Sequence, residues 1–167
     1  MNTIKFDKKQ ALMVAHRGAS GLEPENSVPA FIAAGNRSYF GVETDIHVTA
    51  DGKIVAIHDE STKRVAEKEL NVEEAAYEQV RDIILKDMSK LEMQNDVQKN
   101  TQKRPYLMIP SLEEYICICK KYEKVCVLEL KNRFVPSDIE KVIAEIDKLE
   151  YLENVIFISF DFDNMKD

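Results

Sequence analysis

Three acidic side chains occupy strand-like apolar segments, where an unpaired charge is costly to bury. Glu43 and Asp45 are two residues apart in residues 41–49, which alternate with period two, so both carboxylates project from one face. Glu129 holds a similar position in residues 125–130. Neighbouring carboxylates repel each other, and a shared Mg²⁺ or Ca²⁺, which prefers hard oxygen ligands, relieves that repulsion. The pattern predicts three metal ligands, although solvated acids on a half-exposed strand edge would give the same spacing.

Two histidines end apolar segments in a comparable way. His16 and His58 are each followed at once by a charged residue. If the turn at residues 51–52 (Asp-Gly) closes a two-residue hairpin, Asp45 pairs directly with His58. An imidazole beside carboxylates and a metal transfers a proton near neutral pH, so we expect a general acid and a general base. His47 shares the face of Asp45 but lies nearer the turn, and for it we expect a structural role.

Two cationic side chains extend this cluster. Arg17 offers a planar guanidinium suited to a phosphate oxygen. Lys131 follows Glu129 on the same strand face and is expected either to contact an anionic substrate or to form a surface salt bridge. A metal, two cations and two histidines favour chemistry on a phosphate ester. A glycosidase needs only two carboxylates, and the G-x-S-x-G motif of many acyl-transfer enzymes is absent from the sequence.

Composition sets the class of protein. The 167 residues are 44% hydrophobic and 32% charged, enough for the core of one domain. The formal net charge of −7 gives no overall attraction to nucleic acid or to an anionic membrane. The first apolar run, residues 11–15, is too short for a signal peptide or a membrane span, so we expect a cytoplasmic protein. Cys117, Cys119 and Cys126 show no C-x-x-C spacing and are expected to be buried thiols.

The elements that must position these side chains follow from hydrophobic periodicity. Strands are predicted over residues 12–16, 41–49, 53–58, 125–130 and 155–160, and helices over 28–34, 72–85, 112–122 and 138–149. Ser27, Ser111 and Ser137 are predicted N-caps. This order predicts an α/β fold with mostly parallel strands and with the polar cluster at strand C-termini. Residues 90–103 are expected to form an exposed loop.

Five sequence motifs resemble the glycerophosphodiester phosphodiesterase family. They are AHRGASGLEPENSVPAF (15–31), VETDIHVTADGKIVAIHDESTKR (42–64), IPSLEEY (109–115), VLELK (127–131) and ISFDF (158–162). The motifs run in family order and cover nearly the whole chain apart from residues 65–108. The resemblance implies a TIM-barrel-type (β/α)8 fold, with residues 65–108 as a small insertion after the HD motif.

The same resemblance implies a reaction. It is metal-dependent hydrolysis of glycerophosphodiesters to sn-glycerol 3-phosphate and an alcohol. Carried over by position, the roles are acid and base for His16 and His58, metal ligands for Glu43, Asp45 and Glu129, and phosphate contacts for Arg17 and Lys131. Attack by a neighbouring substrate hydroxyl, through a cyclic phosphate, and direct attack by metal-activated water both fit these residues. The sequence does not fix which alcohol leaves, nor whether the divalent cation is Mg²⁺ or Ca²⁺.

Length is the departure from the family pattern. A full (β/α)8 barrel takes ~250 residues, and at most five strand-like segments occur here. We therefore expect residues 1–167 to form a domain truncated on its C-terminal side, with an open strand edge that favours aggregation or pairing with another chain. Three interpretations stay open: a truncated copy with weak or lost activity, an enzyme completed by self-association or by a separate chain, and a non-catalytic metal- or phosphate-binding module.

Overall fold

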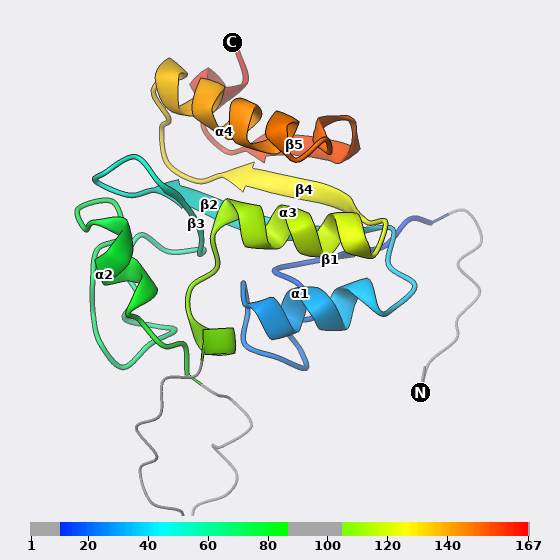
Figure 1. Ribbon diagram of the computed structural model, residues 1–167, viewed down its shortest axis with the longest axis horizontal. Coiled ribbons are helices and arrows are strands. Elements are labelled where there is room, and N and C mark those ends of the chain that lie inside the picture. The colour runs from blue at the N-terminus through cyan, green and yellow to red at the C-terminus, as the bar shows by residue number, and fades with distance from the viewer. Residues whose placement is uncertain (1–10, 87–104, 167) are drawn as a thin grey trace, which may run out of the picture.

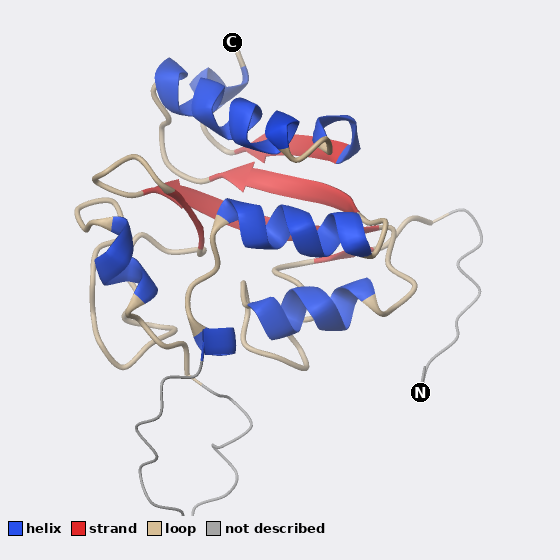
Figure 2. Cartoon of the chain, in the orientation of Figure 1, coloured by secondary structure: helices blue, strands red, loops and turns tan. Residues whose placement is uncertain are grey.

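A twisted sheet of mostly parallel strands forms the centre of the protein (Figure 1, Figure 2). The computed structural model describes residues 11–86 and 105–166. Within these residues the sheet has the order β1 (Val14–Ala15), β2 (Gly41–Val48), β4 (Val125–Leu130) and β5 (Val155–Ser159), each parallel to its neighbours. β3 (Ile54–Ala56) runs antiparallel to the end of β2. The predicted α/β fold with mostly parallel strands is confirmed.

Helices α1 (Val28–Gly35), α3 (Leu112–Lys121) and α4 (Pro136–Lys148) lie along one side of the sheet (Figure 1). Their apolar faces share one core with strand side chains that point toward them. The helices contribute Phe31, Ala34, Leu112, Tyr115, Ile116, Val142 and Ile146, and β4 contributes Cys126, Leu128 and Leu130. The rings of Phe31 and Tyr115 meet edge to face with 5.0 Å between centroids. The buried Tyr115 hydroxyl donates to the carbonyl of Val42, 2.7 Å away, so α3 is tied to the central strand as well as packed on it.

Two of the three predicted caps are confirmed. Ser27 Oγ accepts the N–H of Ala30 at the start of α1. Ser111 and Glu114 form a reciprocal capping box at the start of α3. The Ser137 cap is wrong, because the N-cap of α4 is Val135, two residues earlier, and the helix begins at Pro136. Proline is favoured in the first turn since its fixed φ suits a helix and its missing N–H would have no helical partner.

Three single-turn 3₁₀ helices complete the described elements: Pro105–Leu107, Leu152–Asn154 and Phe162–Met165.

The helix predicted over residues 72–85 is much shorter in the structure. Only α2 (Tyr77–Arg81) is helical. The remaining backbone groups bond to neighbouring segments, with Leu85 N–H donating to the carbonyl of Leu107 at 2.8 Å. Apolar side chains of this region form a second, smaller core: Val55, Ile57, Ala66, Val72, Ala75, Val80, Ile83, Leu85, Leu107 and Ile109. Packing around this core therefore overrides the helical periodicity. The loop predicted over residues 90–103 lies outside the described residues.

The hairpin between β2 and β3 has a different register from the one predicted. Ile46 pairs with Ala56 and His47 with Val55, which is a slip of one residue from pairing Asp45 with His58. The cause is the turn, which has three residues, because the Thr49 N–H donates to the carbonyl of Lys53. Gly52 takes a left-handed conformation in it, with φ of +76°. β3 then ends at Ala56, so His58 lies in the loop beyond the ladder.

The edges of the sheet carry exposed apolar side chains. On β5, Ile156 is 47% and Ile158 37% exposed, and Phe160 beyond it is 92% exposed. The register sets Ile158 beside Glu129, so these isoleucines lie on the sheet face opposite the helices. Within the described residues, no helix combines the length and apolar character needed to cross a bilayer.

The cysteine prediction is confirmed in part. Cys119 and Cys126 are buried in the main core, but Cys117 is exposed on α3. All three are free thiols.

Candidate metal and phosphate site

Glu43, Asp45 and Glu129 meet on one face of two adjacent parallel strands, β2 and β4. The register pairs Asp45 of β2 with Glu129 of β4, and Glu43 lies one strand period before Asp45 on the same face. Each residue offers a carboxylate oxygen, and these oxygens lie within 4.8 Å of one another. All three side chains are buried. The fold therefore brings together the three residues predicted as metal ligands.

Two carboxylate oxygens of this cluster have no hydrogen-bond partner in the described chain. Glu43 accepts the backbone N–H of Arg17 on Oε2, 2.7 Å away, but its Oε1 is buried and unpartnered. Asp45 accepts the Asn26 side-chain amide on Oδ2, 2.8 Å away, and its Oδ1 is also buried without a hydrogen bond. Buried polar atoms are normally paired. Three converging carboxylates with two free oxygens fit a hard divalent cation such as Mg²⁺ or Ca²⁺.

Electrostatics support the same fit. Burial, together with the negative charge of Asp45, raises the pKa of Glu43 to about 7. A carboxylate in this position is stabilised by an added positive charge. A cation shared by the three carboxylates would supply that charge.

Lys131 supplies part of the positive charge from the end of β4. Its Nζ donates to Glu129 Oε1 at 2.8 Å and lies 3.6 Å from Asp45 Oδ1. The same Nζ is 3.2 Å from Nε2 of His58. The lysine therefore lies between the carboxylates and the imidazole, where it forms ion pairs with Asp45 and Glu129.

His58 reaches the site by a route other than the hairpin ladder. The Ile57 N–H donates to the carbonyl of Asp45 at 3.0 Å, which brings the following loop alongside β2. Nδ1 of His58 lies 2.5 Å from Oδ1 of Asp59. Because an ionised carboxylate only accepts, Nδ1 carries the proton in this pair, and Nε2 presents its lone pair toward the Lys131 ammonium. Such an imidazole is set up to accept a proton.

The other two histidines occupy different environments. His16 follows β1 with a 69% exposed side chain, and its Nε2 lies 4.0 Å from Glu43 Oε2. His47 is buried, with Nδ1 2.7 Å from Glu73 Oε1 and Nε2 donating to the carbonyl of His58. The contacts of His47 are those of a residue that braces the loop carrying His58, in keeping with the structural role predicted for it.

Arg17 points its guanidinium at the carboxylates. Its Nη1 donates to Glu25 Oε1 at 3.1 Å, and its buried Nε lies 3.5 Å from Asp45 Oδ2 without forming a hydrogen bond. Arg17 has a φ of +55° and Gly18 one of +73°. The second position requires glycine, because a Cβ there would lie 2.7 Å from the backbone of Ala30. This turn aims the Arg17 side chain and its own N–H at one site.

Sequence reasoning gave no role to three residues that hold this site. Asn26 bonds Asp45 through its amide nitrogen and accepts the Thr44 hydroxyl on its oxygen. Glu25 holds Arg17, and Arg64 in turn holds Glu25 through two hydrogen bonds of 2.8 Å. The only signal in the sequence was their place inside the PEN and HDESTKR motifs.

The sequence matches the profile of the glycerophosphoryl diester phosphodiesterase family over residues 16–166. The chain belongs to this family. A glycerophosphodiester phosphodiesterase of Caldanaerobacter subterraneus is 31% identical over 160 residues, which are 95% of this chain and 61% of that protein. The chain spans about 58 to 61% of the length of the first curated relatives it matches.

Solved structures show the fold that the family shares. A glycerophosphodiester phosphodiesterase from Agrobacterium tumefaciens superposes with a TM-score of 0.73 at 22% identity, over 92% of this chain and 59% of that one. An Oleispira antarctica phosphodiesterase, solved with the product sn-glycerol 3-phosphate, gives 0.68 at 24% identity, with 92% and 59% covered. These neighbours are TIM barrels, and the five-stranded sheet described here covers part of such a barrel. The predicted family and the predicted incomplete TIM-barrel fold are both confirmed.

Proposed function

We propose that this chain carries the catalytic half of a metal-dependent glycerophosphodiester phosphodiesterase. The reaction is hydrolysis of a glycerophosphodiester to sn-glycerol 3-phosphate and an alcohol. Membership of the family supports the reaction class, and the product bound to the Oleispira antarctica relative supports the product. The substrate is accordingly a small molecule.

One observation carries the proposal. Two acceptors and one donor are buried in the same site without a hydrogen bond: Glu43 Oε1, Asp45 Oδ1 and Arg17 Nε. The last two have only ion-pair contacts, Asp45 Oδ1 with Lys131 Nζ at 3.6 Å and Arg17 Nε with Asp45 Oδ2 at 3.5 Å. Such acceptors fit a cation, and such a guanidinium N–H fits an anion. A metal ion together with a phosphate diester satisfies both requirements at once, which neither ligand does alone.

Each residue of the site has its own role in the proposed reaction. Glu43, Asp45 and Glu129 would hold the divalent cation, which when bound polarises a phosphoryl oxygen and offsets its developing charge. Arg17 and Lys131 would orient the phosphate through charge-assisted hydrogen bonds. Nε2 of His58, which faces Lys131 at 3.2 Å, would exchange that contact for substrate and take a proton from the attacking hydroxyl or water. His16, exposed beside Glu43, would return a proton to the leaving alcohol.

The direct test is release of sn-glycerol 3-phosphate from glycerophosphocholine by the 167-residue chain. The protein is treated with a chelator, assayed, and assayed again after addition of Mg²⁺ or Ca²⁺ in parallel. Release that returns with metal and is lost in His16→Ala supports the proposal. The two metals compared at equal concentration identify the preferred cation.

A non-catalytic metal- or phosphate-binding module is the second candidate. The exposed apolar residues of β5 favour it, because a partial barrel leaves the wall of the substrate pocket open on that side. Metal binding measured by calorimetry with no product release from a folded sample would support this module and contradict hydrolysis by the chain.

A further inference from the structure

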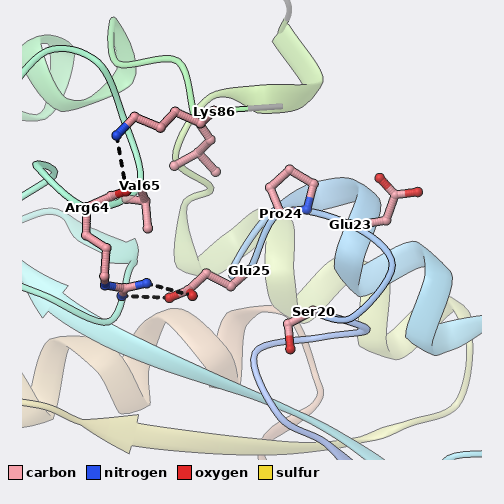
Figure 3. A pocket seen from close by; sticks show the side chains of 8 residues that line it. Ser20, Glu23, Pro24, Glu25, Arg64, Val65 and Lys86 are labelled. Carbon is pink, nitrogen blue, oxygen red and sulfur yellow. Dashed lines mark hydrogen bonds and ion pairs between the residues drawn. The ribbon is translucent and has the colours of Figure 1, made fainter. Parts of the chain in front are cut away.

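Arg64 joins two carboxylates that lie far apart in the sequence. Its two terminal nitrogens donate to the two oxygens of Glu25, each at 2.8 Å, and its Nε donates to Asp59 Oδ2 at 2.7 Å. The close view in Figure 3 shows the end of the Arg64 guanidinium joined to both oxygens of the Glu25 carboxylate by two hydrogen bonds. Three charge-assisted hydrogen bonds from one guanidinium fix the position of both acids.

Each of the two acids holds a residue of the site. Glu25 accepts from Nη1 of Arg17, whose Nε faces Asp45. Asp59 accepts from Nδ1 of His58, whose Nε2 faces Lys131. Arg64 is therefore the branch point of a chain of ion pairs that ends at a phosphate contact on one side and at a proton-accepting imidazole on the other.

We propose that Arg64 is a positioning residue, which fixes the side chains of Arg17 and His58 relative to each other on either side of the metal site. It contacts neither the carboxylate triad nor the position of the phosphate. This inference rests on the proposed function, since it assigns Arg64 a task in that same site.

A purely structural explanation accounts less well for the arrangement. The Arg64 side chain is 47% exposed, and exposed ion pairs contribute little to stability. The hydrogen bond from Arg64, followed by one from His58, lowers the pKa of Asp59 to about 2, although partial burial opposes this. Asp59 therefore stays an acceptor and keeps the proton of His58 on Nδ1 throughout the neutral range. A lysine at position 64 would supply the charge but not the three-way geometry.

The ion pairs on the Asp59 side and on the Glu25 side of Arg64 can be removed separately by substitution. Asp59→Asn frees the imidazole and should lower kcat, because the amide can donate and no longer selects the Nδ1-protonated form. Glu25→Gln frees the Arg17 guanidinium and should raise KM, because that side chain orients the phosphate. Arg64→Lys should do both, with a loss of about 10- to 100-fold in kcat/KM, the range found when the groups that orient site residues are removed.

Arg81 provides a matched control. It makes the same two-pronged contact with a carboxylate, Glu114, at 2.7 and 3.1 Å, and its other hydrogen bond goes to the carbonyl of Ile109. Arg81 is less exposed, at 18%, so Arg81→Lys should lower stability at least as much as Arg64→Lys and leave kcat and KM unchanged once corrected for the folded fraction. An equal loss of kcat/KM in Arg81→Lys and Arg64→Lys would overturn the inference.

A readout independent of turnover is the ¹⁵N spectrum of the His58 imidazole. In the parent chain it should show one nitrogen protonated and one free, at Nδ1 and Nε2 respectively. Arg64→Lys should give averaged nitrogen shifts at His58, and Arg81→Lys should keep the parent pattern. An unchanged His58 spectrum in Arg64→Lys contradicts the inference, whatever the activity.

Chemical rescue gives a second check. Arg64 borders a cavity of about 210 Å³ formed with Ser20, Glu23, Pro24, Glu25, Val65, Leu85 and Lys86. Guanidinium ion added to Arg64→Ala should enter the vacated space and restore the His58 spectrum in part, whereas sodium at equal ionic strength should not. Equal effects of the two ions would contradict a role for the Arg64 guanidinium in positioning His58. If the parent chain releases no product, the proposed function fails, and the imidazole spectra still decide the role of Arg64.

Discussion

The backbone N–H of Arg17 donates to Oε2 of Glu43 at 2.7 Å, so the turn after β1 holds one oxygen of the first metal-site carboxylate. The other oxygen, Oε1, points into the site without a hydrogen bond in the described chain. A carboxylate held by one oxygen is already oriented before a cation arrives. Its free oxygen can then bind with little loss of side-chain entropy.

Glu43→Gln should weaken metal binding before it affects anything else. The amide keeps the shape of the side chain and can still accept from Arg17, but it removes the negative charge that attracts the cation. Calorimetric titration with Mg²⁺ and Ca²⁺ should give a lower affinity than the parent chain. Glu145→Gln, on the helix side of the protein, serves as a control. Unchanged affinity in Glu43→Gln would mean that Glu43 is not a ligand.

His16→Ala and His58→Ala should each lower turnover about 10²- to 10⁴-fold, the usual contribution of a general acid or base. Metal affinity should stay close to that of the parent, because neither imidazole belongs to the carboxylate triad. Product release and metal titration on the same samples separate the two effects. A parallel loss of metal binding would rule out the acid and base roles.

Gly18→Ala should destabilise the protein by more than about 1 kcal/mol, through the combined cost of a positive φ and a clash. A Cβ at this position would lie 2.7 Å from the backbone carbon of Ala30. Gly21 lies in the same loop, where an added Cβ would meet no heavy atom within 4 Å, and it serves as the control. Urea unfolding should show a much smaller change for Gly21→Ala; similar changes in both variants would exclude the steric explanation.

The ion pairs of Asp59 predict a specific acid sensitivity. Its pKa in the folded protein is about 2, below the ordinary 3.8, chiefly because of the hydrogen bond from Arg64. A lowered pKa stabilises the fold above about pH 4, and this stabilisation is lost as the pH falls toward 2. Asp59→Asn should therefore flatten the stability profile between these values, measured by urea unfolding at each pH. Glu67→Gln, an exposed acid of the same segment, should leave that part of the profile unchanged.

The apolar residues on β5 predict concentration-dependent self-association. Ile156 and Ile158 lie on the face of the sheet that the helices leave uncovered, and parallel edges with apolar side chains pair readily. Ile156→Lys should shift the molecular mass seen in sedimentation equilibrium toward the monomer. Ile143→Lys, a change of similar exposure on α4, should not. A parent chain that stays monomeric at high concentration would contradict the prediction.

Elements with strong local signals were predictable from the sequence. β4 runs from Val125 to Leu130, as its apolar alternation predicts, and the Ser111 box fixes the start of α3. The three metal-site carboxylates were also predictable, because strand period and parallel pairing bring them together on one face of the sheet. The sequence was therefore sufficient to predict features that depend on the residues of a single strand or helix.

Features that depend on distant contacts were not predictable. The hairpin register shifted by one residue because Thr49 bonds Lys53 and lengthens the turn, yet His58 still reaches the site through a loop. The pairing of Arg64 with Glu25 joins positions 39 residues apart and leaves no periodic trace in the sequence. Side-chain networks of this kind are fixed only after the chain has folded.

The backbone contact between Leu85 and Leu107 makes this protein a convenient host for a foreign sequence. The N–H of Leu85 donates to the carbonyl of Leu107 at 2.8 Å, so the two ends of the connection between them are already clasped together. Closure entropy grows only with the logarithm of loop length. A reporter domain with adjacent termini could therefore be spliced between these positions at a small entropic cost.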